Sequence, residues 1–421
     1  MVAVLKCCTR GELGEVKTRK QIRPLLPFDS GVLPFALLFR LLPFAFCLLI
    51  FDLIFLPSPA LAQSSPGQPY ATLNHAAVTY NGPDRDASRD LAGPEIRIGL
   101  LASFSGAHQS DGEALRHAAE MAIEEQGNPL LPSKGRLVLV TRDDAGQWGQ
   151  ASTQIVHLLF DDRAVAVITS TDGTSAHLAE QVANKIGVPV LTLASDTTTT
   201  EINLPWIFRL GPSDAAQART FARDIYVTRK LQSVVLLAQD DHDSRVGAEE
   251  FAKAARAMGA PAPQQVALRP GVPLPLGGWE GAQAMVLWSD AALAHSLLPV
   301  LRQSLPNAPI YLCRKAAETS SAEANKDAGV WTAEAVDLRS ASHQTFARRY
   351  RERYGVEPGI EAAQAYDAVR LLATSLRQSG PNRARLRDAL ASVSNFAGIS
   401  GNISFDHAGN DTAAVTLREL K

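Results

Sequence analysis

The stretch 163–200 constrains the fold of this chain most, because two short apolar runs bracket one amphipathic segment. The runs 165–168 and 188–193 are rich in β-branched residues and nearly uninterrupted, which is typical of strands buried on both faces of a parallel sheet. Between them, apolar residues recur at helical spacing, and Gly187 followed by Pro189 ends the helix. The stretch therefore predicts a strand–helix–strand unit of an α/β sheet.

Each of these two strands runs directly into a small polar loop. Ligands of open α/β sheets bind at the carboxyl ends of the strands, because backbone N–H groups and short hydroxyl side chains meet there at helix N-termini. Ser and Thr also cap helices and fill turns without any ligand. Two such loops on neighbouring strands nevertheless favour a site, and its candidate residues are Ser170, Asp172, Gly173, Thr174, Ala194, Ser195 and Asp196.

The composition indicates a globular protein that binds neither nucleic acid nor an anionic membrane. The chain has 421 residues, 46% of them hydrophobic, and a formal net charge of −2 without a basic run outside its extreme N-terminus. These values favour a small neutral or zwitterionic partner. The cysteines are Cys7, Cys8, Cys47 and Cys313, and they lack the spacing of a zinc or redox site, so we expect no metal and no cofactor.

The N-terminal region predicts export to the periplasm. The run 41–56 has the length of the apolar region of a signal peptide, and Ala60-Leu61-Ala62 matches the small-x-small pattern of a cleavage site. We therefore expect residues 1–62 to be a cleaved signal peptide, with an uncleaved anchor as the alternative. Residues 63–94 are rich in Pro, Gly, Ser, Asn and Asp and are expected to form a flexible linker.

From Glu95 onward, strand-like and helix-like segments alternate, which predicts parallel sheets with helices on both faces. Segment 211–214 is a natural boundary, and a second alternating set follows it. Asp143 and Asp144 could form a catalytic pair, but adjacent side chains on a strand point to opposite faces, so only one of them could face a cleft. Segment 240–243, DDHD, lacks the pattern of a calcium loop and is expected to be an exposed loop.

Several segments resemble the leucine/isoleucine/valine-binding-protein-like family of type I periplasmic binding proteins, in the order typical of that family. They are IRIGLLASFSG, AVITSTDGTSAHLAEQVANKIGVPVLTLASDTTTT, WIFRLGPSD, FARRYRERYGVEPGIEAAQAYDAVRLLA and NFAGISGNISFDHAGN. The resemblance implies an α/β fold of two Rossmann-like lobes with parallel sheets, joined by a three-segment hinge. Lobe one would comprise 95–214 and 339–396, and lobe two 215–338 and 397–421.

The resemblance also implies which residues bind the ligand. In such proteins the loops matching 170–174 and 194–196 hold the carboxylate and ammonium of an amino acid, and Tyr366 matches an aromatic position that lines the cleft. The chain departs from the family pattern at Asp111, Asp196, Val246, Arg314 and Lys315. If the last two reach into the cleft, they predict a polar ligand with an anionic group directed at lobe two. The equally weighted alternative is that both cations are solvated at a loop edge.

Three functions remain open. The first, implied by the resemblance, is a monomeric solute receptor of an ABC importer that takes a small amino acid, amide or related carboxylate and works with permease and ATPase subunits. The second is a ligand-sensing receptor that reports to a membrane partner, and the third is an α/β enzyme. The sequence lacks the GxSxG, HExxH, Walker A and GxGxxG motifs, and no apolar run after Ala62 is long enough to span a membrane. The importer subunit is therefore favoured.

Overall fold

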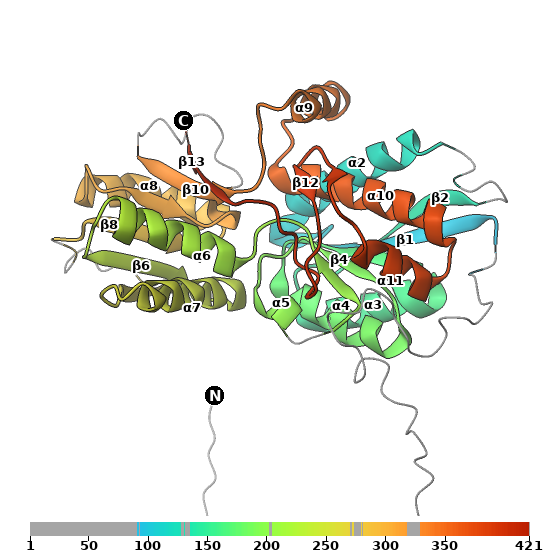
Figure 1. Cartoon of the computed structure of the whole chain (residues 1–421), viewed down its shortest axis with the longest axis horizontal. Helices are drawn as coiled ribbons and strands as arrows, with labels where there is room; N and C mark the ends of the chain where they lie inside the picture. Colours follow the sequence, from blue (N-terminus) through green and yellow to red (C-terminus); the bar gives the residue numbers. More distant parts are fainter. Residues whose placement is uncertain are drawn as a thin grey trace, which may run out of the picture. The chain divides into compact units, whose positions relative to one another are not determined.

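The computed structural model describes Leu91, 93–127, Leu130, 135–201, 204–269, Val272, Trp279, 281–317 and 329–420 (Figure 1). All of these residues belong to one compact unit. The expected signal peptide, 1–62, and most of the expected linker lie outside the described residues. No helix in the described part of the chain has the length and apolar character needed to cross a membrane.

The first sheet has five parallel strands in the order β2-β1-β3-β4-β5. β3 is buried along its whole length and lies between β1 and β4, as its uninterrupted apolar sequence predicts. The strands are β1 (Glu95–Ala102), β2 (Arg136–Asp143), β3 (Ala166–Thr169), β4 (Val190–Thr192) and β5 (Ile207–Arg209).

Helices cover both faces of this sheet, and the sheet with its helices is lobe one (Figure 1). One face carries α2, α10 and α11, with α9 packed on α2 and α10, and the other face carries α3 and α4. The bounds are α2 (Gln109–Glu125), α3 (Trp148–Val156) with a π-helical extension (His157–Asp161), α4 (Gly173–Ile186), α5 (Thr198–Glu201), α9 (Ala341–Tyr354), α10 (Ile360–Ser379) and α11 (Arg383–Ala391).

The second sheet has the order β13-β10-β9-β8-β6-β7, and all pairs except β10–β13 are parallel. Its helices share one apolar core with it and complete lobe two. The strands are β6 (Val234–Gln239), β7 (Gln264–Leu268), β8 (Ala284–Trp288), β9 (Ile310–Leu312), β10 (Val330–Glu334) and β13 (Thr416–Glu419). The helices are α6 (Asp214–Ala222) with a π-helical extension (Arg223–Thr228), α7 (His242–Ala257) and α8 (Ala291–Ser304).

The two sheets are wound in the same way. In each, the first strand lies between the second and the third, so the direction of winding reverses beside it, at β1/β3 in lobe one and at β6/β8 in lobe two. Ligands of such sheets bind at the carboxyl ends of the strands, next to this reversal. The predicted fold class, two α/β lobes with parallel sheets, is confirmed.

The last crossing between the lobes differs from the expected position near Ala397. Strands β11 (Phe396–Ala397) and β12 (Asn402–Ile403) pair with each other, and Ile399 and Ile403 are buried in the core of lobe one. The buried Asp367 carboxylate holds this turn by accepting bonds from the backbone N–H groups of Ile399 and Ser400. The chain reaches the second sheet only at β13. Burial of Ile399 and Ile403 therefore keeps the turn between β11 and β12 in lobe one.

Candidate functional site

Two adjacent aspartates position the loops at the carboxyl edge of lobe one. Asp144 is fully buried and accepts hydrogen bonds from the hydroxyls of Ser103 at 2.6 Å and Ser175 at 3.1 Å. Asp143 accepts a bond from the backbone N–H of Phe104 at 2.8 Å. The pair therefore joins the loop after β1 to the first turn of α4, which is a structural role.

The N-terminus of α4 lies at the lobe junction and receives a carboxylate from lobe two. Asp172 caps the helix by accepting a bond from the backbone N–H of Ser175 at 2.7 Å. The backbone N–H of Gly173 donates to both oxygens of Asp243, at 3.2 and 3.3 Å. Asp243 belongs to the first turn of α7 and also pairs with Lys315 at 3.2 Å. Burial raises the pKa of Asp243, while Lys315 acts in the opposite direction.

The loop after β4 is held from within lobe one by the buried guanidinium of Arg209. This group donates to the carbonyl oxygens of Asp196 and Thr197 and to the hydroxyls of Thr199 and Thr200. Burial lowers the pKa of Arg209 to about 10, and nearby carboxylates oppose that shift. These bonds fix the backbone of the loop at Asp196 and therefore the position from which its side chain extends.

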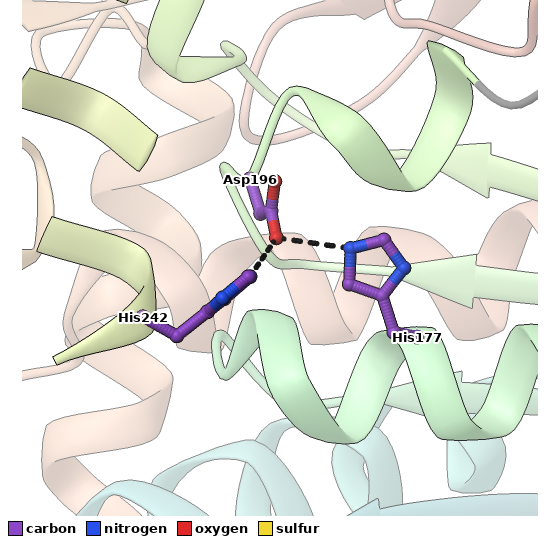
Figure 2. A group of neighbouring side chains, drawn as sticks. All are labelled: His177, Asp196 and His242. Atoms are coloured by element: carbon purple, nitrogen blue, oxygen red, sulfur yellow. Dashed lines mark hydrogen bonds and ion pairs between the residues drawn. The ribbon is translucent and has the colours of Figure 1, made fainter. Parts of the chain in front are cut away.

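The side chain of Asp196 binds two imidazoles from different lobes (Figure 2). Its Oδ2 lies 3.1 Å from Nε2 of His177 on α4 and 2.8 Å from Nε2 of His242 on α7. Bonds from His177, Thr198 and His242 outweigh burial and hold the pKa of Asp196 well below its usual range. Bonds to Asp196 and Glu180 raise the pKa of His177 to about 9. We call His177, Asp196 and His242 the two-histidine cluster.

Arg314 is buried at the junction instead of being solvated at a loop edge. Its side chain leaves the carboxyl end of β9 and donates from Nη2 to the carbonyl oxygen of Leu193 in lobe one, at 3.2 Å. Its backbone N–H donates to Oε1 of Gln217 at 2.8 Å. The residue is 2% exposed, and its Nη1 has no hydrogen-bond partner among the described residues. Arg314 thus connects the carboxyl edges of both sheets.

Asp214 adds a buried acid to the same region. Its Oδ1 accepts bonds from the indole N–H of Trp288 and the amide of Gln217, both at 3.2 Å. Burial raises the pKa of Asp214 to about 7, and the negative charge of Asp243 acts in the same direction. The junction therefore contains acidic groups from both lobes, with Lys315 and Arg314 as the cations beside them.

The structure brings together most of the predicted site residues, but not all of them. The loops 170–174 and 194–196 meet lobe two, where Arg314 and Lys315 lie, and Val246 lies one turn beyond Asp243 on α7. Asp111 is half exposed in the first turn of α2 and bonds to His108.

Tyr366 does not occupy the cleft-lining position that the resemblance implies. It is 6% exposed, packs on Phe346, and donates its hydroxyl to Glu125 in the last turn of α2. Its ring therefore belongs to the packing between helices of lobe one.

His177, His242 and Asp243 were missed, and the expected loop at 240–243 is found only at Asp240 and Asp241. Asp241 caps α7 by accepting the backbone N–H of Ser244 at 2.8 Å, so the helix begins at His242. The two lobes have the same strand order around their first strands, and this repeat is a signal that could have revealed His242 and Asp243. Residues 240–243 follow the first strand of lobe two, at the same topological position as the loop after β1.

A large cavity of about 1080 Å³ borders Arg209, Thr197 and Thr200. Its other walls come mainly from α6, the π-helical extension of α6 and segment 406–417, and none of the predicted site residues lines it. The convergence of charged groups, and not the size of a cavity, therefore identifies the candidate site.

Two α/β lobes whose carboxyl edges meet through charged side chains define a two-lobed ligand-binding protein. The model of the periplasmic binding protein family matches residues 95–418. The chain therefore belongs to that family, which is one of solute-binding proteins and not of enzymes, and the resemblance inferred from the sequence is confirmed.

Solved structures with the same fold come from several bacteria. The branched-chain amino acid transporter substrate binding protein LivJ from Streptococcus pneumoniae, in complex with isoleucine, is 22% identical; the match covers 75% of this chain and 93% of LivJ, with a TM-score of 0.65. A solute binding protein of an ABC transporter from R. palustris, in complex with benzoate, is 21% identical; the match covers 78% of this chain and 93% of that protein, with a TM-score of 0.69. An ABC transporter substrate-binding protein from Desulfitobacterium hafniense, in complex with Leu, is 23% identical; the match covers 78% of this chain and 98% of that protein, with a TM-score of 0.64. At these identities the likeness concerns the fold.

Proposed function

We propose that this protein is the periplasmic solute receptor of an ABC importer and binds a small carboxylate-bearing solute, such as an amino acid or an aromatic acid, between its two lobes. The supporting observation is the bond between the Gly173 N–H and the Asp243 carboxylate. A side-chain carboxylate from lobe two already lies at the N-terminus of α4, in the loop where the family resemblance places the ligand's carboxylate. The first N–H groups of a helix have no partner inside the helix, and together with the helix dipole they favour an anion there.

The chemistry of the ligands in related structures agrees with this proposal. Isoleucine, leucine and benzoate all carry a carboxylate. In our proposal the ligand's carboxylate replaces that of Asp243 at Gly173, and Asp243 keeps its ion pair with Lys315. Asp214 and Asp243 then provide negative charge for an ammonium group, if the ligand has one. The unpartnered Nη1 of Arg314 is a donor for a further oxygen.

A thermal-shift screen tests the proposal. The protein from Gln63 onward is heated with amino acids, aromatic acids and short-chain carboxylates, each beside its amide, in which the carboxylate is replaced by a neutral group. A ligand that binds only the folded state raises the midpoint, by an amount that grows with its concentration. We expect at least one carboxylate to raise the midpoint while its amide does not. Equal shifts for a carboxylate and its amide would reject recognition through the carboxylate.

Uptake measurements separate the importer from a sensor. We expect deletion of the gene to abolish uptake of the identified solute, and restoration of the full chain to recover it. Normal uptake in the deletion strain, together with loss of a transcriptional response to the solute, would favour the sensing receptor.

A further inference from the structure

We propose that the two-histidine cluster, His177, Asp196 and His242, is a binding site for a divalent transition metal that bridges the two lobes. Potential ligand atoms of these three residues all lie within 4.8 Å of one another. Figure 2 shows both imidazoles directed at one carboxylate oxygen, His177 from α4 and His242 from α7. The proposal does not depend on which solute the protein binds.

The hydrogen bonds around Asp196 leave one of its oxygens available to a metal. Its Oδ1 accepts both the backbone N–H of Thr198 at 2.9 Å and the Thr198 hydroxyl at 2.7 Å. Within the described residues, Oδ2 contacts the two imidazoles. Asp196 is 1% exposed, so its carboxylate is already desolvated and fixed in direction. It therefore offers a single-oxygen ligand that needs little rearrangement.

A buried carboxylate lies beside the second ring nitrogen of His177. Oε2 of Glu180, one turn further along α4, is 3.4 Å from His177 Nδ1 and makes no hydrogen bond within the described residues. A carboxylate that accepts the proton of the second ring nitrogen is the usual support of a metal-binding histidine, so a small rotation of the ring would give His177 that support. Nε2 of His177 also lies 2.8 Å from the Thr198 hydroxyl, a contact that a metal would replace.

The spacing of the donor atoms is close to that of a metal site. Metal–ligand bonds of about 2.0–2.2 Å at tetrahedral angles separate two donor atoms by roughly 3.3–3.6 Å. The separations from Oδ2 are 3.1 Å to His177 and 2.8 Å to His242, so each must lengthen by less than about 1 Å. The potential ligand atoms of the two histidines lie within 4.8 Å of each other. The His242 side chain is 43% exposed, which gives an ion a path from solvent.

The donor set determines the class of metal. Two imidazoles and one carboxylate suit Zn²⁺, Co²⁺, Ni²⁺ or Cu²⁺, whereas Ca²⁺ and Mg²⁺ prefer oxygen ligands. Three protein ligands leave a fourth position of a tetrahedral ion for water. Because His242 comes from lobe two and the other two ligands from lobe one, a bound metal holds the lobes in contact.

Titration of the untagged, chelator-treated protein tests the site. Calorimetry should show one Zn²⁺ per chain, and Co²⁺ should give the visible absorption of a four-coordinate ion, which Zn²⁺ abolishes. We expect His242→Gln and His177→Gln each to weaken Zn²⁺ binding at least about 100-fold, and Glu180→Gln to weaken it about 10- to 100-fold. Circular dichroism establishes that each variant is folded. If His177→Gln does not fold, His242→Gln still provides the test, because its side chain is partly exposed.

His157→Gln is the matched control. His157 forms an i,i+4 pair with Asp161 on the surface of lobe one, and its loss should leave Zn²⁺ affinity unchanged. Binding that falls equally in this variant, or that persists in His242→Gln, would overturn the proposal. Small-angle scattering supplies the second readout. Zn²⁺ should make the parent more compact or prevent its opening, and should have no such effect on His242→Gln. Tight Zn²⁺ binding with identical scattering in both proteins would refute the bridging role.

Discussion

At the scale of single residues, Gly173 lies where the two lobes are in contact. A Cβ on Gly173 would lie 2.4 Å from Oδ1 of Asp243 and 2.9 Å from Cβ of Asp196. The contact with Asp196 lies within lobe one, so it persists whatever the position of lobe two. We therefore expect Gly173→Ala to displace the first turn of α4 and to weaken binding of the solute identified in the screen at least tenfold, or about 1.4 kcal/mol.

Gly149→Ala is the control for this substitution. Gly149 lies in the first turn of α3, and a Cβ there would meet nothing within 4 Å. Isothermal titration of both variants should show parental affinity for Gly149→Ala only. Parental affinity in Gly173→Ala would mean that the solute does not bind at the start of α4.

At the scale of elements, the turn 398–400 depends on one side chain of α10. The Asp367 carboxylate accepts bonds from the backbone N–H groups of Ile399 at 2.9 Å and Ser400 at 2.7 Å, and from the Ser400 hydroxyl at 2.5 Å. Asp367→Ala leaves these buried donors without a partner. We expect the free energy of unfolding to fall by about 1–3 kcal/mol per donor left unpaired.

Urea unfolding measures this loss, with Asp367→Asn as the comparison. The Asn side chain keeps the shape and one acceptor oxygen, so its loss of stability should be smaller than that of the Ala variant. Equal stability of the parent and Asp367→Ala would show that the turn is held by the apolar contacts of Ile399 and Ile403 alone.

The sequence predicted strands and helices correctly where the local signals along the chain agree. Its predictions failed where a residue far away in the chain determines the local structure. The loops after β3 and β4 were located because each follows an uninterrupted apolar run. Segment 240–243 was expected to be a loop, but α7 begins at His242, because the Asp241 carboxylate caps the helix. Glycine disfavours a helix interior, and Gly247 stands inside α7 because a Cβ there would lie 1.9 Å from Nε1 of Trp288, which is far away in the chain.

Contacts between residues far apart in the chain also explain why only some of the site residues could be predicted from the sequence. His177 and His242 are far apart in the chain, and only the contact between the lobes brings both to Asp196. Tyr366 lies on α10, which is buried on nearly all sides, so its helical period does not reveal which neighbour its ring faces. The family resemblance suggested that Arg314 reaches the cleft, but the burial of its side chain depends on contacts with Leu193 and Gln217, which the sequence does not reveal.

At the scale of the whole molecule, buried acids make stability depend on pH. Glu334 on β10 is 2% exposed, and burial raises its pKa to about 7 from 4.5, although Arg314 and Arg418 oppose the shift. The folded state therefore holds a proton that the unfolded state has lost between pH 4.5 and 7. The stabilising contribution is complete below the unfolded pKa and is lost as the pH rises through the folded pKa.

Glu334→Gln should reduce this dependence, because the amide stays neutral. We expect urea unfolding of the parent to give a lower free energy at pH 8 than at pH 5, with about 1–3 kcal/mol of the difference removed by the substitution. Glu352→Gln, whose side chain is 61% exposed, serves as the control and should keep the parental difference. A parental pH dependence in Glu334→Gln would contradict the assignment to this carboxyl group.

The central claim is that the two lobes bind one small solute through its carboxylate, and calorimetry of the purified protein with a matched pair of solutes tests it most directly. The pair consists of the best carboxylate from the screen and its primary amide, which have nearly the same shape. A site built for an anion at a helix N-terminus should reject the neutral analogue strongly. We expect one carboxylate to bind per chain and the amide to bind at least about 100-fold more weakly, or about 2.7 kcal/mol. Equal affinities for the two solutes would contradict the account.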